Sequence, residues 1–395
     1  MRTLVTDGGD RPPPATAVTG HWAPAGTLPV PLVYWHGQYE GPVTLHDGRV
    51  LAAGGAGRLL EALADAAVFD PASGTWTETG RLHEARRIHS LTVLRDGRVL
   101  AAGGITGPQA FPPSAVAGSE LYDPEAGTWT PAAPMAGARY GHSATLLPDG
   151  RVLVAGGNRL RDARTVVTLT TAELFDPDTG TWSPAAEMAD ARWHHIVAPL
   201  PGGHLLAVAG LAATGQLLPT ALALCEVYDP RTDSWAATGA LRDARYGHQA
   251  VPLPDGTVLA MGGGRSRSDD ARFDPYGTTR VERYDPETGT WYDEQPLPWT
   301  RSHPRALPLP SGEVLVFGGA DEAALDVGFP SALRFDPVAR RWSPAGPLRT
   351  GRWAFGATSL ADGRVLAAGG VSRAGSATAV FAAAVGAGEA EVFTP

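Results

Sequence analysis

The chain has 395 residues and a mass of 41.1 kDa, and its 49 glycine and 35 proline residues disfavour long uninterrupted helices. Hydrophobic residues make up 43% of the chain and charged residues 18%, which is too apolar for a disordered protein. The net charge of −9 argues against nucleic acid as a partner, and the single cysteine, Cys225, excludes an internal disulfide and a cysteine-based zinc site.

The N-terminal residues contain no apolar run long enough for a signal peptide, and the longest apolar stretch, residues 379–388, is too short to span a bilayer. These features predict a soluble cytoplasmic protein with no membrane partner. Residues 1–18 are expected to form a flexible N-terminal segment, followed by a single domain over residues 19–395.

An internal repeat organises that domain. The string DGRVLAAGG occurs at residues 47–55, 96–104 and 362–370. Close variants start at residues 149, 202, 255 and 311, so seven copies follow one another at intervals of about fifty residues. A period of this length indicates a propeller or a similar array of repeated units.

Each unit predicts four short strands in chain order. The first strand ends at the DG turn, and the second carries the string RVLAAGG, which is rich in β-branched and aliphatic residues. The third contains a tyrosine or phenylalanine followed by Asp-Pro, as in VFDPASGTW (residues 68–76), and the fourth carries the tryptophan. The last copy stops at VFTP (residues 392–395), and its missing strand matches TGHWAPAG (residues 19–26). The N-terminal segment is therefore expected to close the ring and cover an exposed sheet edge.

The Gly-Gly and Tyr-Asp-Pro…Trp strings resemble the kelch repeat, in the form found in bacterial kelch proteins and in the galactose-oxidase group. The resemblance covers nearly the whole domain. It implies an all-β fold, a seven-bladed β-propeller whose last blade is completed by the N-terminal strand.

The connection after Gly-Gly varies in length between units, whereas the other two turns do not. Variable loops on a rigid scaffold are common places for binding residues, so the site is expected on this face, around the channel mouth. The loops carry apolar residues such as Leu59, Phe111 and Phe381. These residues predict either caps over the blades or an apolar funnel for a ligand.

An arginine stands ten residues before the DG turn in six units: Arg86, Arg139, Arg192, Arg245, Arg301 and Arg352. A glutamate occupies the third strand in five of these units: Glu120, Glu173, Glu226, Glu282 and Glu391. Because the two residues occur together, we predict structural ion pairs rather than an anion-binding ring. In unit six Leu333 replaces the glutamate, so Arg301 is expected to meet solvent, another carboxylate or a ligand.

A histidine follows three residues after the arginine in four units: His89, His142, His195 and His248. Four imidazoles from neighbouring blades could bind a transition metal. Their regular recurrence instead favours a role in packing between blades, and no bound metal is predicted.

Seven of the eleven tryptophans occupy the fourth-strand position, and the other four lie in the segments that lead into a first strand. Further departures from the repeat surround these four, mainly in units one, four, six and seven. The candidate catalytic residues are His36, Glu40, His194, Arg301 and His303. The candidate ligand-binding residues are Tyr34, Trp35, Tyr39, Trp193, Trp299, Trp353 and Phe355. Aromatic walls with histidines suit a flat apolar ligand or acid–base chemistry, although the aromatics could also simply fill the mouth.

Kelch propellers include protein-interaction modules, enzymes and copper-radical oxidases, and the fold does not choose among them. The oxidases resembled here need a Tyr-His pair and a cysteine crosslinked to tyrosine, whereas this sequence has no Tyr-His dipeptide and its one cysteine lies in a repeat string. We therefore predict a monomer without cofactor that binds an apolar small molecule or a protein partner at the channel mouth. The alternative is a cofactor-independent cyclase, isomerase or lyase.

Overall fold

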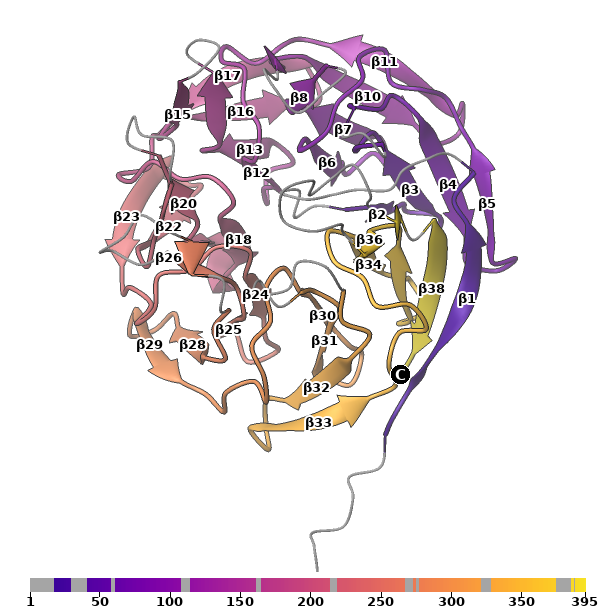
Figure 1. The fold of residues 1–395 in the computed structure, drawn as a ribbon. Coiled ribbons are helices and arrows are strands. Elements are labelled where there is room, and N and C mark those ends of the chain that lie inside the picture. The colour runs from indigo at the N-terminus through magenta and orange to yellow at the C-terminus, as the bar shows by residue number, and fades with distance from the viewer. Residues whose placement is uncertain are drawn as a thin grey trace, which may run out of the picture.

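The computed structural model describes residues 18–29, 41–57, 61–107, 114–160, 165–213, 219–266, 273–274, 277–320, 328–373, 385–386 and 388–395. In this part of the chain, seven four-stranded antiparallel sheets surround a common axis (Figure 1). The only helical element among the described residues is one 3-10 turn, η1 (Pro201–Gly203). None of the described helical residues forms a segment long and apolar enough to cross a membrane.

The first four blades contain these strands, ordered from the axis outward. Blade one has β2 (Val43–Thr44), β3 (Val50–Ala53), β4 (Ala66–Asp70) and β5 (Thr75–Glu78). Blade two has β6 (Ser90–Val93), β7 (Val99–Ala102), β10 (Ser119–Asp123) and β11 (Thr128–Ala132). Blade three has β12 (Ser143–Leu146), β13 (Val152–Ala155), β16 (Ala172–Asp176) and β17 (Thr181–Ala185). Blade four has β18 (Ile196–Pro199), β19 (Leu205–Val208), β22 (Cys225–Asp229) and β23 (Ser234–Thr238).

The other three blades follow the same order. Blade five has β24 (Gln249–Pro252), β25 (Val258–Met261), β28 (Val281–Asp285) and β29 (Thr290–Asp293). Blade six has β30 (Arg305–Pro308), β31 (Val314–Phe317), β32 (Ala332–Asp336) and β33 (Arg341–Ala345). Blade seven has β34 (Gly356–Ser359), β35 (Val365–Ala368), β38 (Glu389–Thr394) and, outermost, β1 (His21–Thr27). The protein is a seven-bladed β-propeller, as the repeat predicts.

The second strand of every blade is buried along its whole length, which explains its unbroken run of aliphatic and small residues. Both faces of a blade pack against its neighbours, so the alternation of apolar and polar residues found in half-exposed strands is absent. The core consequently consists of clusters between blades. One such cluster joins Leu51 of blade one to Leu91 and Tyr122 of blade two.

The DGR string fixes both its own turn and the contact with the next blade. Asp47 Oδ1 accepts the backbone N–H of Arg49 at 2.9 Å, and the Arg49 guanidinium donates to the carbonyl of Pro124 in blade two at 3.1 Å. Arg98 and Arg364 make the equivalent bonds to Pro177 and Pro71 of their neighbouring blades. This explains why the arginine recurs beside a turn that needs only aspartate and glycine.

The N-terminal strand closes the ring. Strand β1 pairs antiparallel with β38, so that Trp22 lies opposite Phe393, as the truncated last repeat predicts (Figure 1). Trp22 is 7% exposed, and its ring centroid lies 4.9 Å from that of Phe317 in blade six. The tryptophan of blade one, Trp76, also donates its indole N–H to the carbonyl of Ala25 in β1. Residues far apart in sequence thus hold blades six, seven and one together.

Five connections after Gly-Gly form small hairpins on one face of the ring. These are β8 (Ile105–Thr106) with β9 (Ser114–Ala115), β14 (Asn158–Leu160) with β15 (Val166–Thr168), β20 (Leu211–Ala212) with β21 (Thr220–Ala221), β26 (Arg265–Ser266) with β27 (Phe273–Asp274), and β36 (Val371–Arg373) with β37 (Val385–Gly386). We call this face the loop face. The apolar residues Leu59, Phe111 and Phe381 lie outside the described residues.

Candidate functional site

Each blade from two to seven reaches its first strand through a four-residue segment that starts at the repeated arginine. We call it the lead-in segment; it spans residues 86–89, 139–142, 192–195, 245–248, 301–304 and 352–355. Its second residue forms a β-bridge with the residue after Gly-Gly of the same blade, as Tyr140 does with Asn158 and Trp353 with Val371. These bridges place the second and third lead-in residues where the hairpins of the loop face begin.

The first lead-in residue is the predicted structural arginine. Its guanidinium bonds the paired glutamate in five blades, at 2.8 Å for Arg86–Glu120, 2.7 Å for Arg139–Glu173 and Arg192–Glu226, and 2.5 Å for Arg245–Glu282 and Arg352–Glu391. Every one of these arginines is at most 1% exposed. The same guanidinium also donates to two backbone carbonyls, which for Arg139 are those of Gly156 and Thr171. The predicted ion pairs are confirmed.

Arg301 keeps the backbone contacts of this arginine without the carboxylate. It is fully buried and donates to the carbonyls of Gly318 at 2.7 Å and Ser331 at 2.9 Å, and to the Ser331 hydroxyl at 2.6 Å. Its guanidinium also lies 5.6 Å from the centre of the Phe329 ring. Burial lowers the pKa of Arg301 to about 10. Among the described residues, no carboxylate forms an ion pair with it. Within that part of the chain, these partners leave Arg301 below the surface rather than facing a ligand.

Blade six compensates for the missing carboxylate in its backbone. In the paired blades the glutamate also accepts two backbone N–H groups, as Glu120 does from His83 and Glu84. At the position of His83, blade six has Pro298, which has no N–H to leave without an acceptor. The apolar Leu333 and the proline therefore occur together for a physical reason.

A pair of matched substitutions tests the role of these arginines. Arg139→Leu should destabilise the fold by about 3–5 kcal/mol, because it leaves the buried Glu173 carboxylate without its partner. Arg301→Leu breaks bonds to carbonyls but leaves no carboxylate unpaired, so its loss should be less than half as large. Urea unfolding of both variants measures the difference. Arg139→Leu with Glu173→Leu is the control and should regain only part of the lost stability, because the N–H groups of Ala136 and Gly137 lose their acceptor. Equal losses for the two single variants would contradict the interpretation.

The repeated histidines lie between blades, as predicted. Three of them pack against the first glycine of the Gly-Gly pair in the preceding blade: a Cβ on Gly54 would lie 2.6 Å from His89, one on Gly103 2.8 Å from His142, and one on Gly156 3.1 Å from His195. His142 and His195 also bond the hydroxyls of Ser90 and Ser143 at 3.1 and 3.0 Å. Burial, followed by the charge of the lead-in arginine, lowers the pKa of His142 and of His248 to about 3. These imidazoles are neutral spacers at neutral pH.

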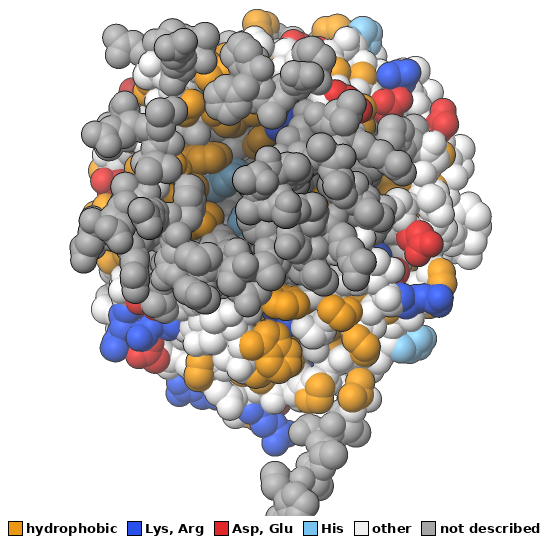
Figure 2. All heavy atoms as spheres, viewed as in Figure 1, with side chains coloured by type: hydrophobic (Ala, Val, Ile, Leu, Met, Phe, Trp, Pro, Cys, Tyr) orange, Lys and Arg blue, Asp and Glu red, His pale blue; other side chains and the backbone are white. Residues whose placement is uncertain are grey.

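The second and third lead-in residues bring aromatic rings together across blades three to seven. The Tyr140 ring lies 6.2 Å from Trp193, edge to face, and Trp193 packs against the cluster of Leu211, Ala221 and Tyr246. Tyr246 lies 6.2 Å from His303, whose ring is 6.3 Å from Trp353. We call these five ring-bearing residues, together with His194 stacked 4.0 Å from Trp193, the aromatic arc. Figure 2 shows histidine and hydrophobic side chains in the hollow at the centre of the loop face.

His194 and His303 adopt a backbone conformation that favours glycine. Their φ angles are 52° and 49°, and the equivalent residues of blades three and five are Gly141 and Gly247. A Cβ on Gly141 would lie 3.3 Å from His194, and one on Gly247 would lie 2.8 Å from His303, so each imidazole covers the glycine of the preceding blade. A left-handed non-glycine residue is strained by roughly 1 kcal/mol. Ile88 and Ala354 occupy the same lead-in position with φ angles of 54° and 51°, so the positive φ is a property of this position in every blade from two to seven.

The remaining candidate residues are distributed differently. Phe355 is fully buried in the cluster between blades six and seven, 5.5 Å from Phe317, and Trp299 is 43% exposed outside the aromatic arc. The candidates Tyr34, Trp35, His36, Tyr39 and Glu40 lie outside the described residues. The structure thus brings together Trp193, His194, His303 and Trp353 from the residues singled out in the sequence.

Tyr140, Asn158 and Tyr246 belong to this site but are missed by sequence reasoning. Tyr140 and Tyr246 resemble ordinary repeat residues, and only the ring contacts reveal their place. Asn158 leaves a clearer signal, because it is the single asparagine of the chain and follows a Gly-Gly pair.

Copper chemistry does not fit the described residues. No group of three or more histidine, cysteine, aspartate or glutamate side chains within the described part of the chain could hold a metal ion. Cys225 is buried in β22, where burial raises the pKa of its thiol to about 11. We therefore derive no step through a metal.

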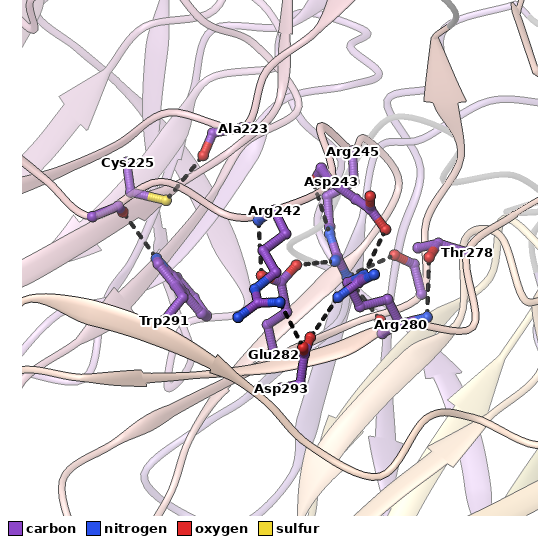
Figure 3. A network of polar contacts seen from close by, with 12 residues as sticks. Ala223, Cys225, Arg242, Asp243, Arg245, Thr278, Arg280, Glu282, Trp291 and Asp293 are labelled. Atoms are coloured by element: carbon purple, nitrogen blue, oxygen red, sulfur yellow. Dashed lines mark hydrogen bonds and ion pairs between the residues drawn. The ribbon is translucent and has the colours of Figure 1, made fainter.

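Blade five carries the densest polar network of the loop face (Figure 3). The buried pair Arg245–Glu282 lies beside the half-exposed Arg280, which bonds Asp243 at 2.9 Å and Asp293 at 2.6 Å. Arg242 also reaches Asp293, at 3.0 Å. Among the described residues of this rim, the cations and carboxylates named here pair with one another, so they do not present a free charge for a phosphate.

Comparisons with known proteins agree with this architecture. No family model matches the chain. It is 31% identical over 261 residues to human Kelch-like protein 34, covering 66% of this chain and 37% of the relative. It is 26% identical to Kelch-like protein terF of Aspergillus terreus, over 62% of this chain and 52% of the relative. Alpha-scruin of Limulus polyphemus is also 26% identical, with coverage of 56% and 23%. The chain therefore spans between about a quarter and a half of the length of these curated relatives.

Two solved structures share the fold. A fungal alcohol oxidase of the AA5 family, in complex with copper, has a TM-score of 0.69 at 18% identity and covers 95% of this chain and 76% of its own. YjhT has a TM-score of 0.61 at 15% identity, with coverage of 80% and 98%. At such identities the likeness concerns the fold alone. Relatives, repeat and ring architecture agree, and the chain is a kelch-repeat β-propeller.

Proposed function

We propose that the protein is a binding module whose channel mouth on the loop face holds a flat apolar group of a small molecule or of a protein partner. The observation that carries the proposal is the aromatic arc, which joins rings from five successive blades. Aromatic rings contribute large apolar area and face-specific contacts, and they are frequent in binding sites. Kelch-like proteins among the relatives make a partner protein a natural candidate for the occupant.

The strained histidines support the same proposal. Glycine at residues 194 and 303 would relieve the positive φ and would still fit the ring, as Gly141 and Gly247 do. Strained residues that persist are characteristic of functional sites. Ile88 and Ala354 share this positive φ, so the conformation alone does not distinguish the histidines. The placement of the two imidazoles beside Trp193 and Trp353 supports a role at the mouth.

A second candidate function is catalysis by a cofactor-independent cyclase, isomerase or lyase. One contact favours it: the Ser302 hydroxyl lies 2.7 Å from His303 Nδ1 and thereby orients the ring. An oriented imidazole is a suitable general acid or base near neutral pH. Monomeric state and a cytoplasmic location remain predictions from the sequence.

Reverting the histidines to glycine tests the binding site without damaging the fold. We expect 8-anilinonaphthalene-1-sulfonate, a flat aromatic probe, to bind the native protein once per chain, as followed by its fluorescence. The variant His194→Gly with His303→Gly should weaken binding by about tenfold or more. Its melting temperature should stay unchanged or rise, because the strain is removed.

The exposed His46 of the opposite face provides the matched control, since His46→Ala should leave probe affinity unchanged. Equal affinity of the double glycine variant and the native protein would show that the mouth is not the site.

A further inference from the structure

Asn158 departs from the repeat in a way that the fold does not require. It is the single asparagine of the chain and directly follows Gly156 and Gly157. The other six blades place glycine or an apolar residue at this position: Ala56, Ile105, Leu211, Gly264, Ala320 and Val371. An amide side chain here must find hydrogen-bond partners that its counterparts do not need.

The surroundings of Asn158 supply only part of those partners. Its backbone pairs with that of Tyr140 through two hydrogen bonds of 2.9 and 2.8 Å, which brings the two side chains to the same side of the ladder. Burial raises the pKa of Tyr140, and a hydrogen bond from the Asn158 side chain opposes that increase. Asn158 is 1% exposed, yet its Oδ1 has no hydrogen-bond partner among the described residues. A buried acceptor without a donor is destabilising, so its retention calls for a reason.

A second buried polar atom without a partner belongs to a neighbour of the same tyrosine. Trp193 meets the Tyr140 ring edge to face at 6.2 Å, and its indole Nε1 also finds no acceptor within the described part of the chain. The equivalent bridge position in blade two is Arg87, whose charge acts on Tyr140. Tyr140 thus contacts two uncharged side chains, of which one carries an unused acceptor and the other an unused donor.

We propose that this corner of the mouth, formed by Tyr140, Asn158 and Trp193, binds an amide group of the occupant. The N–H of an amide would donate to Asn158 Oδ1, and its carbonyl would accept from Trp193 Nε1. An amide offers a donor and an acceptor side by side without a charge, which a carboxylate or an ester does not. The assignment rests on the proposed function of the mouth and specifies the chemistry of what binds there. A primary carboxamide of a small molecule and a peptide bond share this chemistry.

The single asparagine makes the test direct. Protein grown with ¹⁵N-asparagine and ¹⁵N-tryptophan contains one asparagine side-chain NH2 group, and the shift of its signals can be followed while benzamide is added. We expect a saturable shift of those signals and of the Trp193 indole N–H, which Trp193→Phe identifies. Methyl benzoate lacks the N–H, and benzoate carries a charge in its place. Both should bind at least about fivefold more weakly than benzamide.

Asn158→Leu, which installs the residue of blade four, is the matched variant. It should reduce benzamide affinity to that of methyl benzoate and leave the melting temperature equal or higher, because a buried polar group without full partners is removed. A fall in melting temperature with unchanged benzamide affinity would make Asn158 structural and overturn the proposal. Tighter binding of benzoate than of benzamide would also overturn it, in favour of an anion held by Arg87.

Further measurements distinguish a peptide from a small molecule as the source of the amide, and distinguish failure of the amide assignment from failure of the proposed binding site. Tighter binding of N-acetylphenylalanine N′-methylamide than of benzamide would assign the amide to a peptide, and the reverse order would assign it to a small molecule. If benzamide and methyl benzoate bind equally, the mouth binds flat rings but the amide assignment is wrong. If neither binds and the anilinonaphthalene probe also fails, the proposed function itself is wrong.

Discussion

Deletion of residues 1–30 should abolish cooperative melting. The deletion removes β1, and with it Trp22, Ala25 and Leu28, which are buried in the clusters that join blade seven to blades six and one. Loss of a buried tryptophan alone destabilises a fold by about 3–5 kcal/mol, which is a large share of the stability of a typical domain. The deletion also exposes the edge of β38, which can then pair with other chains.

Calorimetry and light scattering of the truncated protein measure this effect. A shorter deletion, of residues 1–18, provides the control, because it leaves β1 intact and should leave the melting transition unchanged. A cooperative transition at the native temperature after removal of residues 1–30 would contradict closure of the ring by β1.

Acid should begin to destabilise the protein as soon as the pH falls below the value at which a free imidazole titrates. The pKa of His142 and of His248 is lowered to about 3 by burial and the lead-in arginines, and the pKa values of His89 and His195 lie well below the usual range for the same reasons. Arg86, Arg139, Arg192 and Arg245 are the neighbouring cations, and each opposes protonation of the histidine beside it. Neighbouring histidines oppose protonation of His89 and His195 as well. In the unfolded chain these four imidazoles bind protons near pH 6.5.

This difference in proton binding makes the folded state less stable as the pH falls. Above pH 6.5 neither state binds these protons and the stabilisation is fully present. As the pH falls from 6.5 towards 3, the unfolded state gains four protons that the native state does not. Each contributes about 1.4 kcal/mol per pH unit, so stability should fall by about 5 kcal/mol per unit. For a stability of about 5–15 kcal/mol, the midpoint of unfolding should lie between about pH 4 and 5.5.

Circular dichroism at stepped pH values, combined with urea unfolding, yields the number of protons taken up. His248→Gln should reduce that number by about one. Stability that stays flat from pH 6.5 to 4.5 would contradict the neutral, buried histidines.

The repeat explains why most of the fold could be predicted. Seven copies in one chain act as their own alignment, so that the co-occurrence of Arg139 with Glu173 and the truncation after Val392 each indicate a contact. The same comparison shows that Leu333 breaks the pattern, but it does not show that Gly318 and Ser331 supply carbonyls to Arg301. Backbone acceptors have no sequence signature, which is why a ligand was expected there.

The site was only partly predictable for a similar reason. Exposure separates Trp353, which is 2% exposed, from Trp299, which is 43% exposed, although the two occupy neighbouring places in the repeat. The positive φ of His194 and His303 is likewise invisible in a sequence, since it depends on how the lead-in segments turn around the channel. Asn158 could have been noticed as a lone asparagine, but only the structure shows that its side-chain oxygen has no partner among the described residues.

Fluorine NMR of protein labelled with 5-fluorotryptophan tests the location of the site most directly. The eleven tryptophans divide into seven in fourth strands and four elsewhere, so each group serves as a reference for the other. With the anilinonaphthalene probe at saturation, the resonances of Trp193 and Trp353 should move, and those of the fourth-strand residues such as Trp76 and Trp235 should not. Shifts confined to the fourth-strand tryptophans, with Trp193 and Trp353 unchanged, would place binding on the outer rim and contradict a site at the channel mouth.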